Sequence, residues 1–436
     1  LLYSAAAAGH GILAHTADGE LYRLTREYLE SKGYKIHVVH LQTPGKGAGW
    51  NPLLYGARKY EEGDFRRAVA SFEGLAKGLL RGVDAEALQR QKLMAVKVFV
   101  GLCLIACREV RPEEVTLPLL YSMLLDDSIF GRNGDDIKFY IYSSKDRVLM
   151  GEWKLFLDAQ AEDCAVAVSF LLDVLSALYL DKGLSGLLAG SDFEARELHK
   201  GKTAIFVLSG DGEITSVLAA QLIHTLLTEL MELKEKETRG NRIDVILDDF
   251  SSLPPLPLLA ERMARCEKRG ICLHLFIQSM HRLKDAYGEH AAAYIAEDCR
   301  CLLYLHTAET ETLGALSARC GSRTEADGTE RPLLNSSKLQ HFSKEEGEAL
   351  VLLDRRRPFI TKLPDCRLYM EKLGIRESDG EQLPAYERKN ISSFSFRERV
   401  WELRQVEEQK EYEAILEEEG MTDEEWHEEV MRHQVM

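Results

Sequence analysis

Short apolar runs alternate with longer amphipathic stretches along much of this chain, and this alternation predicts a sheet flanked by helices. Residues 243–247 and 271–277 are mainly apolar and too short for globular helices, which is typical of strands covered on both faces in a parallel sheet. Between them, the prolines within residues 254–257 delay a helix, whose apolar positions then recur at helical spacing until Gly270. Further strands are predicted at residues 11–15, 34–41, 200–208 and 301–306.

Residues 58–200 have a different pattern and are predicted to be mainly helical. Apolar side chains follow helical spacing through residues 64–80, 88–107 and 165–180, and Pro112 opens a further helix. We therefore expect an α/β fold with a mostly parallel sheet and one all-α insertion. The expected divisions are an α/β domain in two parts, residues 1–57 and 201–370, the insertion, residues 58–200, and an acidic helical tail, residues 371–436, with a capping box at Thr422–Glu425.

The 436 residues carry a formal net charge of −16, which argues against a surface coated with nucleic-acid-binding side chains but leaves room for a locally basic channel. The 9 cysteines and 13 histidines show no paired spacing typical of zinc ligands. We therefore expect reduced, mostly buried thiols and no zinc motif. No uninterrupted apolar run reaches the ~20 residues that span a bilayer. Because the chain begins with leucine, we expect it to be a fragment that lacks its natural amino terminus.

The clearest candidate chemistry follows the strand at residues 243–247. Asp248 and Asp249 come directly after it, at the carboxyl end of a strand, where open α/β sheets bind ligands. In phosphoryl-transfer folds the first acid holds Mg²⁺, and we expect Asp248 to do so while Asp249 orients and deprotonates the attacking water. Gln278 ends the next strand and is a candidate hydrogen-bond partner for a γ-phosphate or for that water. The plainer alternative is that two acids only end a strand and face solvent.

The longer unit around these residues is more specific than the acid pair. A strand ending in Asp248-Asp249-Phe250, a proline-rich loop, a helix, a strand ending in Gln278-Ser279 and then LKDAYG resembles the type IV secretion coupling proteins, the TraG/TraD-type conjugative DNA-transfer ATPases. The order strand, GELYR, helix, GYK, strand and WNPL near the amino end is also similar to that family.

Two positions depart from the family's pattern. Asp249 stands where the family usually has glutamate, which weakens the expected base. Thr16-Ala17-Asp18-Gly19-Glu20 keeps only the Gly-Glu of the family's Asp-Pro-Lys-Gly-Glu, so a contact beside the nucleotide is expected to be altered. An equally good interpretation is that this segment is only a helix amino terminus, at which acidic side chains are favourable.

The resemblance, which covers about residues 12–362, implies a RecA-like P-loop NTPase fold and a hexameric motor. It implies ATP and Mg²⁺ as cofactors, and single-stranded DNA, relaxase-type substrate proteins and type IV secretion channel components as partners. It also implies a location on the cytoplasmic face of the bacterial inner (plasma) membrane, through membrane segments upstream of this chain. The implied catalytic residues are Asp248, Asp249, Gln278 and, acting on a neighbouring subunit, Arg269 or Arg265, and the implied cofactor contacts are Asp248, Ser279 and Glu20, with Mg²⁺ on Asp248.

The phosphate-binding loop itself does not occur in these residues. No GxxxxGKS or GxxxxGKT is present, and Gly201-Lys202-Thr203 does not qualify because a strand follows it, whereas a phosphate loop opens a helix. In the resembled family that loop precedes the first residue here, so we expect the chain as given to bind nucleotide poorly. Three functions stay open: an ATP-driven coupling-protein motor, a degenerate scaffold of the same family that recruits substrates without hydrolysis, and, less favoured, another RecA-like translocase such as a chromosome-partitioning pump.

Overall fold

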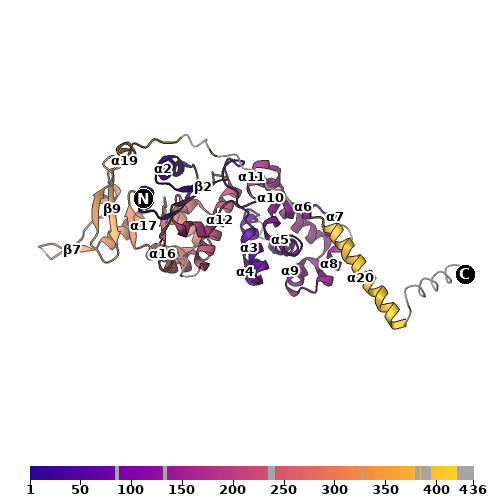
Figure 1. Cartoon of the computed structure of the whole chain (residues 1–436). Coiled ribbons are helices and arrows are strands. Elements are labelled where there is room, and N and C mark those ends of the chain that lie inside the picture. Colours follow the sequence, from indigo (N-terminus) through magenta and orange to yellow (C-terminus); the bar gives the residue numbers. More distant parts are fainter. Residues whose placement is uncertain are drawn as a thin grey trace. The chain divides into compact units, whose positions relative to one another are not determined.

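The computed structural model describes residues 1–83, 88–130, 135–233, 241–326, 328–378, 383 and 394–419. The chain divides into two compact units, the first comprising Leu1–Pro52 with Gly190–Arg388 and the second Leu53–Ala189 with Lys389–Met436. Figure 1 shows strands mixed with helices in the first unit and packed helices in the second. The capping box expected at Thr422–Glu425 lies outside the described residues, and the domain boundaries drawn from composition stay predictions.

A five-stranded sheet forms the centre of the first unit. Its strand order is β2-β3-β1-β4-β5, and every pair of neighbours runs parallel. β1, β3 and β4 are buried along their whole length, as expected for strands covered on both faces. The predicted α/β class with a mostly parallel sheet is confirmed. The strands are β1 Gly11–Thr16, β2 Lys35–His40, β3 Thr203–Leu208, β4 Ile243–Leu247 and β5 Ile271–Leu275.

The strand ends differ from the prediction by two or three residues, for reasons visible in the backbone. β5 stops at Leu275 because the carbonyl of Phe276 accepts the N–H of Phe250, 2.8 Å away, in the turn after β4. β3 starts at Thr203 because the preceding residues form the 3-10 helix η3, Ala195–Lys200, and Lys202 has a φ of 47°. The pattern of apolar residues predicts which residues lie inside a strand, whereas local hydrogen bonds and backbone angles determine where the strand begins and ends.

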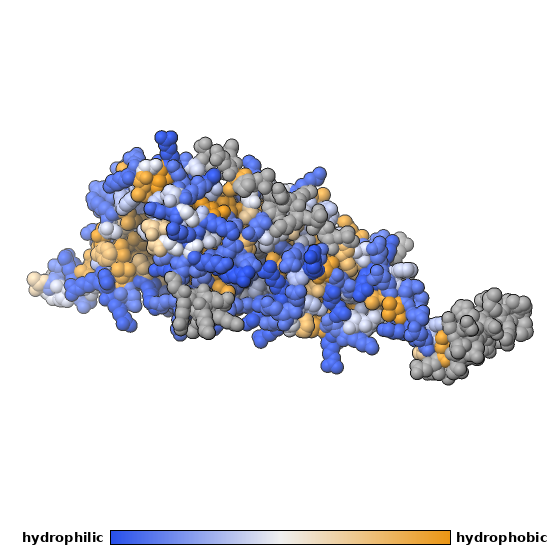
Figure 2. Space-filling view, viewed as in Figure 1, coloured by the Kyte–Doolittle hydropathy of each residue, from blue (hydrophilic) through white to orange (hydrophobic). Residues whose placement is uncertain are grey.

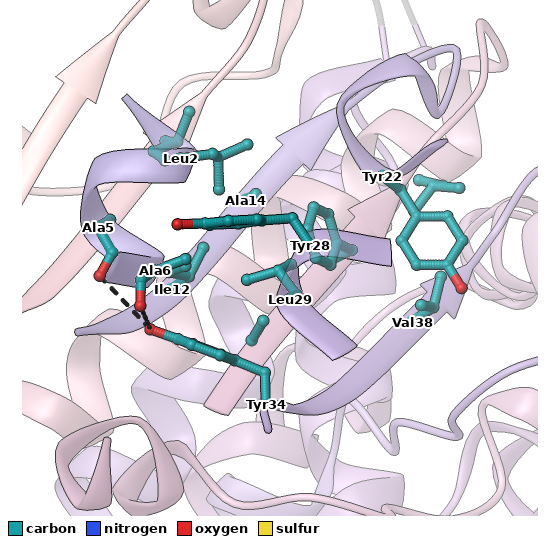
Figure 3. Packing of buried hydrophobic residues seen from close by; sticks show 14 residues of the cluster. Leu2, Ala5, Ala6, Ile12, Ala14, Tyr22, Tyr28, Leu29, Tyr34 and Val38 are labelled. Carbon is teal, nitrogen blue, oxygen red and sulfur yellow. Dashed lines mark hydrogen bonds between the residues drawn. The ribbon is translucent and has the colours of Figure 1, made fainter. Parts of the chain in front are cut away.

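Helices α1 (Leu2–Ala8) and α2 (Glu20–Ser31) cover one face of the sheet. Their apolar side chains form a single cluster with alternate residues of β1 to β4, among them Ile12, Phe206 and Ile246. Figure 3 shows Tyr34, the residue before β2, reaching toward α1, where its hydroxyl lies near the carbonyls of Ala5 and Ala6. The cluster fixes the α1–β1 connection against the sheet.

The rest of the first unit adds two small antiparallel sheets and further helices. A three-stranded sheet has the order β10-β9-β6, and β7 pairs with β8 in a hairpin. Figure 2 shows a mainly polar surface with apolar patches, one of them over the β9 region. The strands are β6 Cys301–Tyr304, β7 Ser322–Thr324, β8 Glu330–Pro332, β9 Glu348–Leu353 and β10 Phe359–Lys362. The helices are α12 Glu213–Glu232, η4 Phe250–Ser252, α14 Leu259–Cys266, η5 Glu267–Arg269, α15 Met280–Tyr287, α16 Glu289–Asp298, α17 Thr310–Cys320, α18 Ser336–Gln340 and α19 Cys366–Leu373.

The second unit is built around α5 (Gln89–Glu109), which is buried from Met94 to Ala106 apart from Lys97. It packs against α3, α4, α6, α9 and α10, and α20 packs against α7 and α8. These residues are helical as predicted from their periodicity. The remaining helices are α3 Leu54–Glu61, α4 Phe65–Leu79, η2 Pro112–Glu114, α6 Leu117–Leu124, α7 Asp127–Phe130, α8 Asp135–Ser144, α9 Arg147–Leu157, α10 Ala161–Leu180, α11 Lys182–Leu187 and α20 Phe396–Glu419.

Among the helices that the structure describes in both units, two are long and apolar enough to cross a membrane by length and composition alone. They are α10 and α12, each 20 residues long, and counting uninterrupted apolar runs in the sequence did not identify them. In α12, 61% of the most apolar window is buried, which is typical of a core helix, whereas the corresponding share in α10 is 22%. Length and composition do not by themselves place either helix in a bilayer.

Candidate functional site

The carboxyl ends of the parallel strands bring the candidate residues to one edge of the five-stranded sheet. Asp248 and Asp249 follow β4, and Gln278 comes three residues after β5, which is the neighbouring strand. The backbone joins the two ends, because Phe276 donates to the carbonyl of Leu247 (3.0 Å) and accepts from Phe250 (2.8 Å). The acid pair and the glutamine therefore lie on adjoining turns at the edge where α/β sheets bind ligands.

His15, which the sequence reasoning did not single out, joins three strand ends behind the acid pair. It is 1% exposed, its Nδ1 lies 3.1 Å from the carbonyl oxygen of Asp248, and its Nε2 lies 3.1 Å from the hydroxyl of Ser209. Because a carbonyl oxygen only accepts, Nδ1 carries the proton. Burial lowers the pKa of His15 to about 4, so the ring is neutral at pH 7. Its position at the end of a buried strand was the only signal in the sequence.

Asp248 is surrounded by negative charge. Burial raises the pKa of its carboxyl, and the neighbouring carboxylates Asp18, Asp249 and Glu20 raise it further, although its Oδ1 accepts the N–H of Asp249 at 3.1 Å. These are oxygen donors, which Mg²⁺ prefers over nitrogen or sulfur. A divalent cation bound here would relieve the repulsion among the carboxylates, so the donor set fits Mg²⁺.

Asp249 adopts a conformation that is uncommon for residues other than glycine. Its φ is 47°, in the left-handed region, and the turn is held by the hydroxyl of Ser252, which donates to the Asp249 carbonyl at 2.7 Å. Among the described residues, its Oδ1 is buried without a hydrogen-bond partner. A strained backbone with an unpaired buried oxygen is the kind of feature that clusters at functional sites.

The segment Thr16 to Glu20 runs from the last residue of β1 to the first residue of α2, whose N-cap is Gly19. The Oδ1 of Asp18 accepts the hydroxyl of Thr16 (2.8 Å) and the N–H of Glu20 (2.9 Å). Although burial opposes it, these hydrogen bonds lower the pKa of Asp18. Glu20 is exposed in the first turn of α2. The segment thus places carboxylates at the candidate site while one of them, Asp18, is held by hydrogen bonds within the turn that leads into α2.

Gln278 and Ser279 differ in how free their side chains are. The Gln278 side chain is exposed. Ser279 is the N-cap of α15: its oxygen accepts the N–H of Arg282 at 3.3 Å and its hydroxyl donates to the carboxylate of Glu309. Gln278 is therefore the freer of the two to meet a ligand.

Arg269 does not lie with the other candidates. It ends η5 just before β5, at the amino-terminal edge of the sheet, and its guanidinium donates to the carbonyl of Leu233 at the end of α12. Arg265 is exposed on α14. Within one chain neither arginine joins the acid pair, and their action on a neighbouring subunit stays a prediction. Gly201-Lys202-Thr203 leads into β3 as expected and forms no phosphate loop.

Comparison with known proteins agrees with this fold. The chain resembles the solved plasmid coupling protein TrwB in complex with a non-hydrolysable ATP analogue (TM-score 0.56, 16% identity, 88% of this chain and 90% of that one). The structure of TrwB in complex with ADP and Mg²⁺ is equally similar (TM-score 0.56, 17% identity, 88% and 89%). At this identity the likeness shows the RecA-like fold.

Sequence comparison identifies the family. The chain is 28% identical over 174 residues to the type IV secretion system-coupling protein VirD4 of Bartonella quintana, covering 38% of this chain and 26% of that protein. It is 23% identical over 339 residues to the conjugal transfer protein TraG of Escherichia coli, covering 72% and 51%. The chain thus spans between a quarter and about half of these relatives. The family model described as type IV secretory system conjugative DNA transfer matches residues 6–352, so the chain belongs to that family of type IV secretion coupling proteins.

Proposed function

We propose that this chain forms most of the motor domain of a conjugative coupling protein, which uses ATP to move single-stranded DNA and relaxase-type proteins into the secretion channel. The acid pair carries the proposal: a strained Asp249 and a half-buried Asp248 beside further carboxylates, at the ligand-binding edge of a RecA-like sheet. Support comes from TrwB, which has this fold and has been solved with an ATP analogue and with ADP and Mg²⁺.

In this proposal each residue at the carboxyl edge of the sheet has a separate role in phosphoryl transfer. Asp248 would hold Mg²⁺, which supplies the positive charge that phosphoryl transfer requires. Asp249, with its unpaired Oδ1, would orient and deprotonate the attacking water, and the exposed Gln278 would sense the γ-phosphate. Ser279 and Glu20 would flank the nucleotide.

We further propose that the protein works as a hexameric ring on the cytoplasmic face of the bacterial inner membrane. Several large apolar side chains in β6 and β10 or directly after β6 are exposed, which supports a subunit interface because such surfaces are usually buried in assemblies. They are Leu303, Leu305, Phe359 and Ile360. A ring would also let Arg269 or Arg265 act on a neighbour's nucleotide. Membrane attachment would come from segments outside these residues.

The test is DNA-stimulated ATP hydrolysis by the protein as its gene encodes it. Asp248→Ala should lower turnover by about 100-fold or more, since electrostatic groups at the transferred phosphate contribute that much. The control is Asp173→Ala, which removes an exposed carboxylate on α10 and should leave turnover unchanged. Unchanged hydrolysis by a folded Asp248→Ala protein would contradict the motor assignment.

A second candidate function, a scaffold that recruits substrates without hydrolysis, is favoured by one observation. Asp249 is shorter than the glutamate expected there, and its turn is strained. If the encoded protein binds single-stranded DNA but shows no ATPase above an Asp248→Ala background, the scaffold is correct. Asp249→Glu would then restore hydrolysis only if the shortened acid is the cause.

A further inference from the structure

A second polar cluster lies on β4, at the opposite end from the acid pair. Asp244 is the second residue of the strand and its side chain is 3% exposed. Its register partners are Ile12 on β1 and Cys272 on β5, and side chains at paired positions point to the same face of a sheet. The cluster therefore lies on the face covered by α1 and α2. Asp248 lies four residues further along the chain, about 13 Å away in an extended strand.

Three potential metal ligands meet here, Asp244, Cys272 and His274, and a second histidine, His10, contacts the aspartate. The Nε2 of His274 lies 2.8 Å from one carboxylate oxygen of Asp244, and the Nδ1 of His10 lies 2.7 Å from the other. His274 is two residues after Cys272 on β5, so both point to this face. The oxygen, sulfur and nitrogen ligand atoms of Asp244, Cys272 and His274 lie within 4.8 Å of one another. His10 comes from the α1–β1 connection, so the cluster joins three segments that are far apart in sequence.

The simpler account is a buried ion pair. Arg242 donates to Asp244 at 3.2 Å, and protonated His274 would add a second positive partner. An ion pair explains the arginine and the histidines, but it gives the thiol no role. Burial lowers the pKa of His274, but hydrogen bonds with Asp244 and Cys272 outweigh it and raise that pKa to about 9. The hydrogen bond with His274 in turn lowers the pKa of Cys272. The sulfur of Cys272 lies within 4.8 Å of the ligand atoms of Asp244 and His274, so a cation bound among them would have a thiol ligand that the ion pair does not require.

The connection that carries His10 is held in place from both sides. The hydroxyl of Tyr34 donates to the His10 carbonyl at 2.7 Å, and the N–H of Gly11 donates to the carbonyl of Arg242 at 2.9 Å. The potential ligands are only partly closed to solvent, with 24% of the His10 side chain and 21% of the His274 side chain exposed. An ion therefore has access to a set of ligands on a rigid frame.

We propose that Asp244, Cys272 and His274 form a binding site for a zinc-class divalent cation, with His10 beside it on the second carboxylate oxygen of Asp244. A carboxylate, a thiolate and an imidazole are ligands that Zn²⁺ uses, and His10 or a water would complete four-coordination, whereas Mg²⁺ takes oxygen ligands. Ligand atoms around tetrahedral Zn²⁺ lie roughly 3.4 Å apart, so the present hydrogen bonds would open slightly as the ion replaces the shared protons. The bound ion would pin the edge strand β5 to β4 and to the α1–β1 connection.

The test uses Co²⁺ as a spectroscopic probe with the whole chain freed of metal by a chelator. Binding should give one Co²⁺ per chain with a thiolate-to-cobalt charge-transfer band, which Zn²⁺ removes and excess Mg²⁺ does not. Cys272→Ser should abolish the band, and Asp244→Asn should weaken binding at least about tenfold. The control Cys366→Ser removes an exposed thiol on α19 and should keep the band. No band, or a band that survives Cys272→Ser, would overturn the proposal.

A second measurement guards against variants that fold poorly. Zn²⁺ should raise the melting temperature of the wild-type chain and of Cys366→Ser but not that of Cys272→Ser. An equal rise in all three would place the ion elsewhere and refute the site. Both measurements omit nucleotide, so their outcome is independent of the ATPase test at Asp248.

Discussion

Acid should loosen α14, the helix that connects the acid turn after β4 to β5. His224 on α12 contacts this helix, because a guanidinium N–H of Arg262 points at His224 Nδ1 over 3.3 Å. A guanidinium only donates, so Nδ1 must be unprotonated and a proton added there would break the contact. Burial and the positive charge of Arg262 lower the pKa of His224 from 6.5 to about 4.

The size of the effect follows from proton linkage. A group whose folded pKa lies below its unfolded pKa stabilises the fold fully above the unfolded value and loses that contribution as pH falls toward the folded value. With an unfolded pKa of 6.5 and a folded pKa of about 4, the loss of stability is small at pH 7. At pH 5 the equilibrium constant for opening rises by a factor of roughly 30, which is a loss of about 2 kcal/mol. Because His224 is only partly buried, we take about 1 to 2 kcal/mol as the expected range.

Amide hydrogen exchange read by mass spectrometry on peptides from α14 measures this effect locally. Going from pH 7 to pH 5, the opening constant of α14 in the wild type should rise about 5- to 30-fold relative to His224→Gln, which accepts from Arg262 at any pH. His290→Gln, an exposed histidine on α16, is the matched control and should behave as the wild type. If the wild type and His224→Gln respond alike to pH, the proton is not taken up at His224 and the reasoning is wrong.

Two further predictions concern packing and hydrogen bonding. Gly101→Ala should destabilise the second unit by about 1 to 3 kcal/mol, because its new Cβ would lie 2.4 Å from the buried Trp153 ring. Gly74→Ala in α4 should instead stabilise the unit by up to about 1 kcal/mol, because the space around Gly74 is open. Chemical denaturation followed by near-ultraviolet circular dichroism of tryptophan separates the two results, and equal effects would contradict the packing argument. Tyr34→Phe should cost about 1 kcal/mol by removing a buried donor, measured as a lower melting temperature against Tyr294→Phe, whose ring is 63% exposed.

The sheet was predictable because its signal is local. Buried parallel strands read as short apolar runs, and β1, β3 and β4 lie where those runs are. The ends of β5 and β3 were not predictable to the residue, because they depend on hydrogen bonds to the turn after β4 and on η3. The same holds for α14, where the apolar spacing begins at Leu256 but the helix begins at Leu259.

Some residues of the candidate site could also be predicted from the sequence, and others could not. The position of Asp248 and Asp249 after an apolar run was enough to expect them at the ligand-binding edge, whereas the role of His15 depends on contacts with Ser209 and Asp248, each about two hundred residues away. The cluster around Asp244 is a stronger case, since zinc motifs are recognised by close spacing in sequence. Its residues become neighbours only through the parallel pairing of β4 with β5 and of β1 with β4.

The direction of the strands also limits how Arg269 can act. In a parallel sheet, residues that follow strands gather at one edge and residues that precede strands gather at the other, so Arg269, just before β5, is separated from Asp248 by the length of a strand, about 16 Å. A guanidinium cannot cover that distance within one subunit. If Arg269 stabilises a transferred phosphate, the amino-terminal edge of one sheet must face the carboxyl edge of the next, which is a head-to-tail interface of the kind that closes into a ring. The same side chain also caps α12, so such an arrangement would couple subunit contact to the end of the main core helix.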